Sequence, residues 1–125
     1  FLEDLWAQTG LKPQDTILSG FSQGAMMALH AGLSLPEPLM GIIAFSGAFI
    51  PPQGFGPGSA RPPVCLVHGD MDNVVDPDFS RQAAEVLEAA GVPVAYHVSQ
   101  GVGHGISPDG LAFANAFIEE VSARS

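Results

Sequence analysis

The regular alternation of short apolar segments with helix-forming ones is the feature that most constrains the fold of this chain. Four apolar segments have the length of strands, and they lie at 16–20, 41–47, 63–69 and 94–100. Helix-forming patterns lie at 1–10, about 23–34, 76–91 and 111–121. The runs at 41–47 and 63–69 are continuously apolar, as expected when both faces of a strand are covered. We predict an α/β fold with about four mostly parallel strands and flanking helices.

Several residues are predicted to set helix ends and to fill the core. Asp76 can cap the helix that follows it, and Gly91 can end that helix. Phe79 and Val86 belong to the apolar stripe of the same helix. Met27, in the preceding helix, is predicted to be a core residue rather than part of a lipid-binding surface.

The length of the chain limits how many domains it can contain. A chain of 125 residues is one domain or part of one. Because it starts inside a helical pattern without an initiator Met, we expect 1–125 to be a single, N-terminally truncated domain.

A formal charge of −9 argues against nucleic acid and anionic membranes as partners. No apolar segment approaches the ~20 residues of a membrane span. The single cysteine, Cys65, fits a reducing, cytoplasmic location.

A serine between two glycines is the strongest chemical signal in the sequence. Residues 20–24 follow the pattern G-x-S-x-G, after a predicted strand and before a predicted helix. This is the strand–turn–helix setting of a nucleophile elbow. Because the turn is sharp, we expect Gly20 and Gly24 to be required for Ser22 to stand there. The alternative is that Ser22 is a plain helix N-cap, a role that does not need both glycines.

A serine nucleophile needs a base and an acid, and later loops offer both. The carboxyl ends of parallel strands share one edge of a sheet, where ligands bind. His104 follows the strand at 94–100 and is the candidate base. The segment after 63–69 offers four candidate acids: Asp70, Asp72, Asp76 and Asp78. The chain therefore has the order serine, acid, histidine that such an elbow requires.

Three segments resemble those of a known family. They are "GFSQGAMMAL" at 20–29, "HGDMDNVVDP" at 68–77 and "GVGHGI" at 101–106. They resemble the signatures of the carboxylesterase/phospholipase family of α/β-hydrolases, which includes acyl-protein thioesterases. The resemblance implies that Ser22 is the nucleophile, that His104 is the base and that Asp72 orients His104. It also implies hydrolysis of small-molecule carboxylic esters or thioesters without a metal or cofactor. On this resemblance, the chain corresponds to the C-terminal half of an α/β-hydrolase.

The resemblance also indicates how an oxyanion would be bound. In the family, an H-G loop ahead of the elbow supplies one donor, and we find no such loop in this sequence. The residue after the nucleophile, here Gln23, supplies the other donor through its backbone N–H. The position of Asp72 adds to its case as the acid. It lies two residues beyond Asp70, where the loop can turn back toward His104.

A Pro/Gly-rich loop at 47–63 leaves the same predicted edge of the sheet. We expect it to border the substrate pocket, with Phe49 and Phe55 as apolar contacts. The segment 16–20 would be an open sheet edge without a preceding half-domain. We expect self-association through that edge, because it is short and apolar and has no charge or proline to protect it.

Alternative functions remain open because a catalytic triad fixes the mechanism and not the substrate. One alternative is another α/β-hydrolase, such as a peptidase or a polyester depolymerase. The other is a non-catalytic half-domain that pairs with a partner.

The remaining histidines have plainer predicted roles. His68 ends a strand beside Gly69 and is predicted to be a structural hydrogen-bonding residue. His30 and His97 fall within a helix and a strand, and they are predicted to pack or to lie on the surface. The histidines have no short ligand spacing, so no metal site is predicted.

Overall fold

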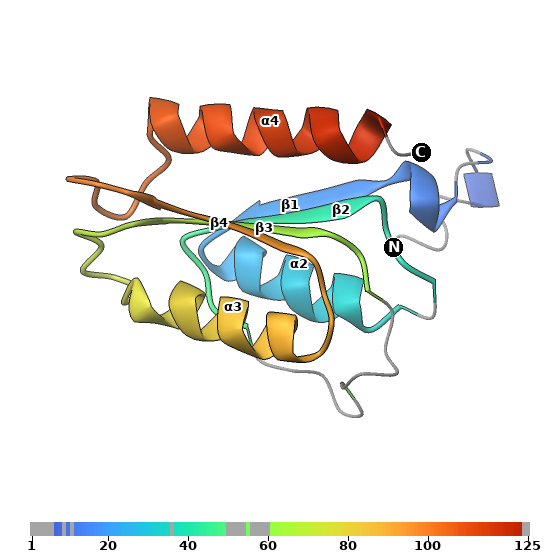
Figure 1. Cartoon of the computed structure of the whole chain (residues 1–125), viewed down its shortest axis with the longest axis horizontal. Helices are drawn as coiled ribbons and strands as arrows, with labels where there is room; N and C mark the ends of the chain where they lie inside the picture. The colour runs from blue at the N-terminus through green and yellow to red at the C-terminus, as the bar shows by residue number, and fades with distance from the viewer. Residues whose placement is uncertain are drawn as a thin grey trace.

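A four-stranded parallel sheet organises the part of the chain that the structure describes. The computed structural model describes residues 7–8, 10, 12–35, 37–49, 55 and 61–123. The strand order is β1-β2-β3-β4, and helices cover both faces of the sheet (Figure 1). The elements are η1 (Pro13–Asp15), β1 (Ile17–Phe21), α2 (Gln23–Leu33), β2 (Gly41–Phe45), β3 (Val64–Gly69), α3 (Asp78–Ala89), β4 (Val94–Ser99) and α4 (Pro108–Ala123). Within these residues, no helix is long and apolar enough to cross a membrane.

The predicted alternation of strands and helices is confirmed, and small local effects shift the bounds. β2 ends at Phe45 because Ser46, with a φ of 55°, leaves the extended conformation. α3 begins at Asp78, whose N–H donates to the Asp76 carboxylate at 2.9 Å. Asp76 thus satisfies an N–H at the start of the helix, as predicted. The predicted helix at 1–10 lies largely outside the described residues.

Two apolar cores hold the helices against the sheet. One lies between the sheet and helices α2 and α3, and the other lies between the sheet and α4. Every residue of β2 and β3 is buried, which explains their continuously apolar sequences. Leu29 anchors α2, Leu87 anchors α3 and Phe117 anchors α4. Burying a large apolar side chain of this kind contributes roughly 1.5–3 kcal/mol. Cys65 is also buried, and burial raises the pKa of its thiol to about 12.

Three residues predicted to fill the core are instead exposed. Met27 is 71% exposed, Phe79 is 47% exposed and Val86 is 42% exposed, so their predicted placement is wrong. The buried stripes of α2 and α3 consist largely of small residues: Ala25, Ala28, Ala83 and Ala84. Phe79 and Val86 lie two turns apart, at the margin of the α3 stripe. Small residues bring the helix backbones close to the sheet, and the bulkier side chains then lie outside the contact.

The two ends of the sheet differ in what surrounds them. The strands end at the left of Figure 1, where α3 and α4 begin. β1 and β4 are the outer strands, and the residues of β1 are less buried than those of β2. Self-association through the outer edge of β1 stays a prediction.

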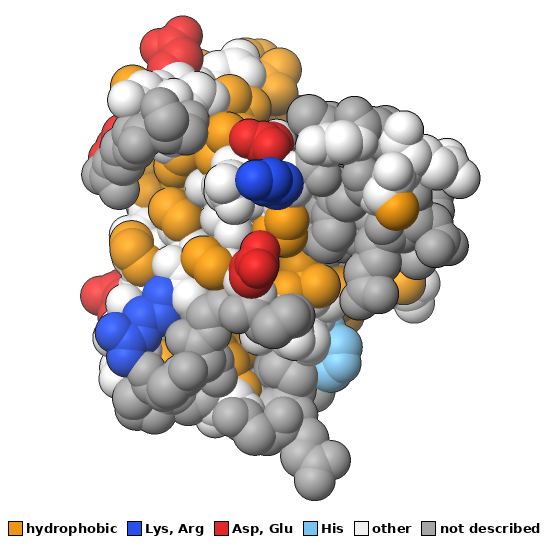
Figure 2. Space-filling model, turned by 90° about the vertical axis from the view of Figure 1, so that its right-hand side faces the viewer, with side chains coloured by type: hydrophobic (Ala, Val, Ile, Leu, Met, Phe, Trp, Pro, Cys, Tyr) orange, Lys and Arg blue, Asp and Glu red, His pale blue; other side chains and the backbone are white. Residues whose placement is uncertain are grey.

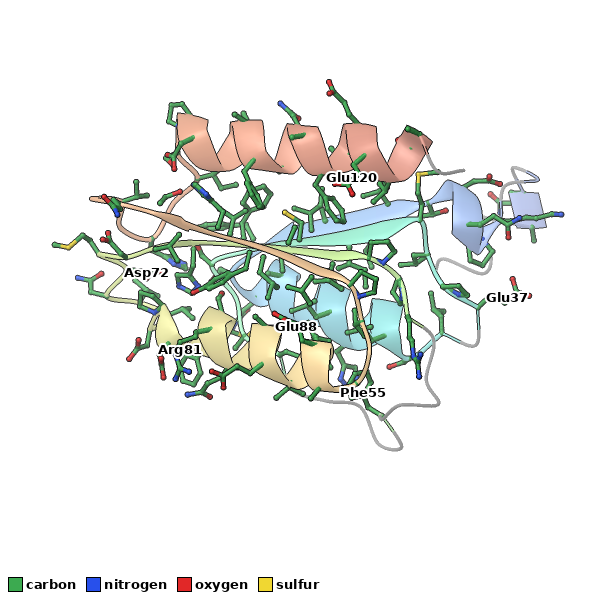
Figure 3. The ribbon with its side chains drawn as sticks, in the orientation of Figure 1. Glu37, Phe55, Asp72, Arg81, Glu88 and Glu120 are labelled. Carbon is green, nitrogen blue, oxygen red and sulfur yellow. The ribbon has the colours of Figure 1, made fainter. Side chains whose placement is uncertain are left out.

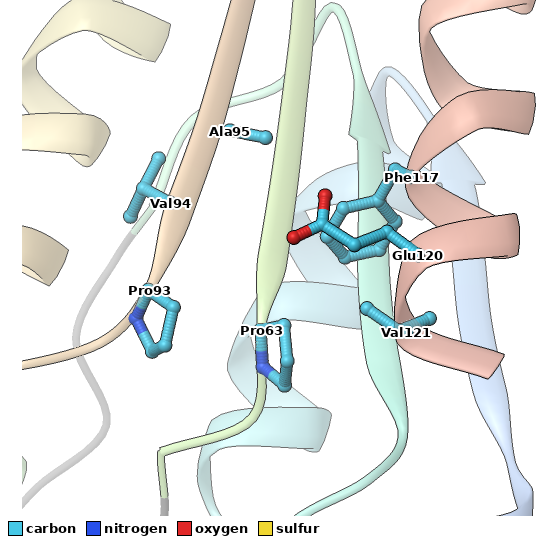
Figure 4. A pocket seen from close by; sticks show the side chains of 7 residues that line it. All are labelled: Pro63, Pro93, Val94, Ala95, Phe117, Glu120 and Val121. Carbon is cyan, nitrogen blue, oxygen red and sulfur yellow. The ribbon is translucent and has the colours of Figure 1, made fainter. Parts of the chain in front are cut away.

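A cavity of about 320 Å³ opens at the amino ends of the strands, away from the loops that carry the predicted catalytic residues. It lies between the starts of β3 and β4 and the C-terminal half of α4 (Figure 4). It is lined by Pro63, Pro93, Val94, Ala95, Phe117, Glu120 and Val121. Figure 2 shows this end of the molecule, where exposed apolar side chains are interspersed with acidic and basic ones.

Candidate active site

β1 leads directly into Ser22, which stands in a sharp turn before α2. Ser22 has a φ of 58° and a ψ of −117°, a strained conformation that costs roughly 1–3 kcal/mol. Its backbone N–H donates to the Phe45 carbonyl at 2.9 Å, and its carbonyl accepts the N–H of Ala25 at 3.0 Å. Its side chain makes no helix-capping hydrogen bond, contrary to the N-cap alternative. The turn therefore leaves the hydroxyl available for another partner.

The two glycines of the motif differ in how much the turn needs them. A Cβ on Gly20 would lie 2.2 Å from the carbonyl oxygen of Gly24, which is too close for any side chain. A Cβ on Gly24 would meet no atom within 4 Å among the described residues. The expectation that both glycines are required is thus correct for Gly20 and wrong for Gly24 in this part of the structure. The reason is that the helix backbone passes over Gly20, whereas Gly24 faces outward.

Three predicted side chains from three loops meet at the carboxyl edge of the sheet. His104 Nε2 lies 3.0 Å from Ser22 Oγ, and His104 Nδ1 lies 2.7 Å from Asp72 Oδ2. A carboxylate only accepts hydrogen bonds, so Nδ1 carries the hydrogen and Nε2 faces the serine hydroxyl as an acceptor. Asp72 lies at the end of the molecule where α3 begins (Figure 3). The structure therefore forms a continuous hydrogen-bonded chain from serine to histidine to aspartate.

The carboxylate of Asp72 is buried, and it accepts several hydrogen bonds. Asp72 is 6% exposed, and its Oδ1 accepts the backbone N–H groups of Val74 at 2.8 Å and Val75 at 2.9 Å. Burial opposes ionisation, but the hydrogen bonds from His104 and from these two N–H groups outweigh it. The pKa of Asp72 therefore lies below its ordinary value. A charged Asp72 can hold His104 in one tautomer and stabilise its protonated form.

Asp70 has a different role from Asp72. Its Oδ1 accepts the Gly101 N–H at 2.7 Å, which ties it to the turn that precedes His104. Close approach of the two loops also needs Gly69, where a Cβ would lie 2.3 Å from the Val102 carbonyl oxygen. Asp70 therefore holds the histidine loop from outside the hydrogen-bonded chain.

The other two candidate acids act at the start of α3. Asp76 accepts the first N–H of that helix, and Asp78 pairs with Arg81 one turn further on. Of the four candidate aspartates, Asp72 is the one whose side chain meets the histidine.

A second histidine, His68, lies next to the Asp72 carboxylate. His68 is buried, and its Nδ1 lies 2.6 Å from Ser80 Oγ while its Nε2 lies 2.9 Å from the Val75 carbonyl oxygen. These contacts fit its predicted role as a hydrogen-bonding residue. Its Nε2 also lies 3.2 Å from Asp72 Oδ2, a contact that sequence reasoning missed. The four-residue spacing of the two side chains was the signal that could have indicated it.

Of the remaining predicted site residues, Gln23 directly follows Ser22 in the chain, whereas Phe49 and Phe55 pack elsewhere. Phe49 and Phe55 pack edge to face, with ring centroids 5.1 Å apart, against the core shared with α2 and α3. In Figure 3, Phe55 lies near the C-terminal end of α3, far from Asp72. Gln23 is the first residue of α2, where backbone N–H groups have no acceptor within the helix. Their substrate and oxyanion roles stay predictions.

Exposed apolar side chains border the hydrogen-bonded chain of Ser22, His104 and Asp72. The ring of Phe21 lies 4.8 Å from the ring of His104, centroid to centroid. Met71, Val74 and Ile106 are exposed in the loops that carry Asp72 and His104. Across the described residues, no three His, Cys, Asp or Glu side chains lie together as a set of metal ligands.

Sequence comparisons find one family across nearly the whole chain. A model of the phospholipase/carboxylesterase family matches residues 2–122. Acyl-protein thioesterase 1 of Gibberella zeae is 31% identical over 118 residues, which cover 90% of this chain and 50% of the relative. Acyl-protein thioesterase 1 of Saccharomyces cerevisiae is 33% identical over 117 residues, which cover 89% of this chain and 52% of the relative. The chain thus spans about half the length of the curated relatives it matches.

A structural comparison agrees with the sequence comparisons. The crystal structure of esterase PE8 matches with a TM-score of 0.89 and 53% sequence identity, over 97% of this chain and 57% of that one. The chain therefore has the fold of part of an α/β-hydrolase, as predicted.

Replacing Gly20 by alanine will destabilise the elbow, because its Cβ would overlap the Gly24 carbonyl. Overpacking of this kind costs about 1–3 kcal/mol or more. The matched variant Gly24→Ala has room for its methyl group and should gain about 0.4–1 kcal/mol. Urea denaturation of the full-length protein that contains this sequence measures both effects. Equal stability of the two variants would contradict this account of the turn.

Stability should depend on pH through Asp72. Its pKa is lower in the folded state, so its contribution is present above the ordinary carboxyl value of about 3.9 and is lost as the pH falls through the folded value. Asp72→Asn does not titrate at this position. The difference in free energy of unfolding between wild type and Asp72→Asn should therefore narrow as the pH falls below about 5. Urea denaturation across this range tests it, and a difference that persists unchanged in acid would refute it.

Proposed function

The chain belongs to the phospholipase/carboxylesterase family of α/β-hydrolases, and on this premise we propose that it carries the catalytic residues of a hydrolase of carboxylic esters or thioesters. In this proposal, Ser22 forms an acyl-enzyme. The observation that carries the proposal is the hydrogen-bonded chain of Ser22, His104 and Asp72 at the carboxyl edge of the sheet. A strained elbow and a buried, ionised acid support it.

The reaction proceeds in two halves. Ser22 Oγ attacks the carbonyl carbon while His104 Nε2 takes the hydroxyl proton. His104 then gives this proton to the leaving alcohol or thiol as the acyl-enzyme forms. Next, His104 takes a proton from water, whose oxygen attacks the acyl carbon, and it returns the proton to Ser22 Oγ as the acid departs. Asp72 stabilises the imidazolium in both halves and stays ionised throughout.

Negative charge on the carbonyl oxygen needs donors during both halves. The backbone N–H of Gln23, at the N-terminal end of α2, is the first donor in this proposal. The helix dipole adds a partial positive charge at this end. The second donor is expected from the loop that precedes the elbow in the family's fold.

The surroundings of the triad favour an ester with an apolar part. The exposed apolar side chains of Phe21, Met71, Val74 and Ile106 offer contact to an acyl chain or to an apolar leaving group. The relatives named above are thioesterases and an esterase, which favours ester or thioester substrates over peptides. Peptide or polyester hydrolysis would use the same chemistry at Ser22, so substrate panels must distinguish them.

Ser22→Ala should abolish labelling by a fluorophosphonate and reduce ester turnover to the level that binding and oxyanion donors sustain without a nucleophile. That residual rate is about 10³–10⁴ over water. The measurement uses the full-length protein with nitrophenyl esters, an acyl thioester and a peptide anilide. Ser19→Ala, on the same strand, is the matched control and should behave as wild type. Wild-type turnover by Ser22→Ala would exclude this serine as the nucleophile, and a wild-type protein without labelling or turnover would favour a non-catalytic domain.

Asp72→Asn should cost far more activity than Asp70→Asn. Asparagine at 72 can present a donor to His104 Nδ1 and thereby hold the wrong tautomer, an effect of about 10⁴ in kcat in serine proteases. Asparagine at 70 keeps an oxygen for the Gly101 N–H, so a small loss is expected. Comparison of kcat for the two variants decides between them. A larger loss at Asp70 would reverse the assignment.

A further inference from the structure

A buried histidine that the mechanism does not use lies directly behind the catalytic acid. His68 comes from β3 and is 1% exposed, and its ring is held on both sides. Nε2 faces the Val75 carbonyl at 2.9 Å and Nδ1 faces Ser80 Oγ at 2.6 Å. A neutral imidazole satisfies both contacts, with Nε2–H donating to the carbonyl and Nδ1 accepting the serine hydroxyl hydrogen.

The side chains of His68 and Asp72 both form hydrogen bonds with the backbone of Val75. Val75 donates its N–H to Asp72 Oδ1 at 2.9 Å and receives the His68 N–H on its carbonyl. The same His68 nitrogen lies 3.2 Å from Asp72 Oδ2, which is the oxygen that His104 contacts at 2.7 Å. The positive end of the N–H dipole thus lies beside the carboxylate oxygen that faces the base.

The contacts of His68 continue toward the nucleophile. Ser80 Oγ, on α3, lies 3.3 Å from the Gly47 carbonyl oxygen as well as beside His68. Gly47 packs against the elbow, because a Cβ there would lie 3.4 Å from the Ser22 carbonyl oxygen. The start of α3 therefore lies beside both His68 and the back of the elbow, and the single hydroxyl hydrogen of Ser80 is donated to the closer acceptor, His68 Nδ1.

We propose that His68 is a positioning residue, which orients the Asp72 carboxylate so that Oδ2 faces His104. The proposal rests on the proposed function. An apolar residue at 68 could fill the space, but it would leave the Val75 carbonyl unpaired and the orientation of the carboxylate less constrained. Among the described residues, the titratable side chains in contact with Asp72 are His68 from β3 and His104 from the loop after β4, while α3 presents the Ser80 hydroxyl to His68.

Two substitutions distinguish the contacts made by Nε2 of His68 from the contact made by Nδ1. Glutamine can place an N–H near the position of Nε2 and keep the contacts with Val75 and Asp72. Asparagine is shorter and can place a polar atom near Nδ1, which keeps the contact with Ser80 alone. His68→Gln should therefore retain kcat within several-fold, whereas His68→Asn should lose about 10–100-fold in kcat, the range for polar groups that orient catalytic ligands in metal sites. KM should change little in either variant.

Two further readouts distinguish positioning from a purely structural role. Thermal melting should show similar losses for the two variants, so that stability does not explain a difference in kcat. The far-downfield proton resonance of the His104 Nδ1–H, assigned by its loss in His104→Gln, should be kept in His68→Gln and displaced or broadened in His68→Asn. Equal kcat and equal spectra for the two variants would overturn the proposal, as would a loss that appears only in KM.

A third variant covers the case in which neither His68 variant folds. Ser80→Ala removes the hydroxyl that holds Nδ1, and it should lower kcat by a smaller factor without changing KM. Wild-type kcat together with a wild-type resonance in Ser80→Ala would count against the proposal. All measurements use the full-length protein. If wild type neither hydrolyses esters nor reacts with a fluorophosphonate, the proposed function fails, and the resonance still decides whether His68 orients Asp72.

Discussion

The parallel pairing of β3 with β4 is the constraint on which the candidate site depends. The two strands run in register from Val64 beside Val94 to Gly69 beside Ser99, so they end at the same height. Asp70 continues the pairing, because its N–H donates to the Ser99 carbonyl at 3.0 Å. Both loops therefore leave the sheet side by side. A slip of one residue would turn the side chains of a strand to the opposite faces and would offset the loops. The close contact between Asp72 and His104 is thus a consequence of strand register.

Hydrogen bonding allows a charged group to be buried at this position. The Asp72 carboxylate accepts from two backbone N–H groups and from His104, and His68 lies against it as well. A buried carboxylate without such donors would take up a proton rather than stay charged. The contacts that hold down the pKa of Asp72 also fix the direction of its oxygens. Electrostatics and orientation therefore depend on the same small group of contacts.

Ser22 stands at a less enclosed place than Asp72. Ser22 follows β1, an outer strand whose residues are only partly buried, whereas Asp72 follows the fully buried β3. On one side the elbow is held by β2, through the Ser22 N–H and the Phe45 carbonyl. On its other side no strand pairs with β1 among the described residues.

The sequence by itself determined the layered α/β fold, the elbow at Ser22 and the need for Gly20, because strand and helix periods and sharp turns depend on neighbouring residues. It also placed one histidine and several aspartates at the carboxyl edge, since parallel strands end together. The resemblance and the position of Asp72 in its loop already favoured Asp72 over Asp70 as the partner of His104, and the tertiary structure added that Asp70 accepts a backbone N–H instead. It also revealed the contact of His68 with the acid and excluded several apolar residues from the core. The contact of Asp72 with His104 depends on the register of strands, and the exposure of the apolar side chains depends on how the helices pack, so a local pattern does not determine either. The contact of His68 with Asp72 spans only four residues, but it depends on how the loop after β3 turns back.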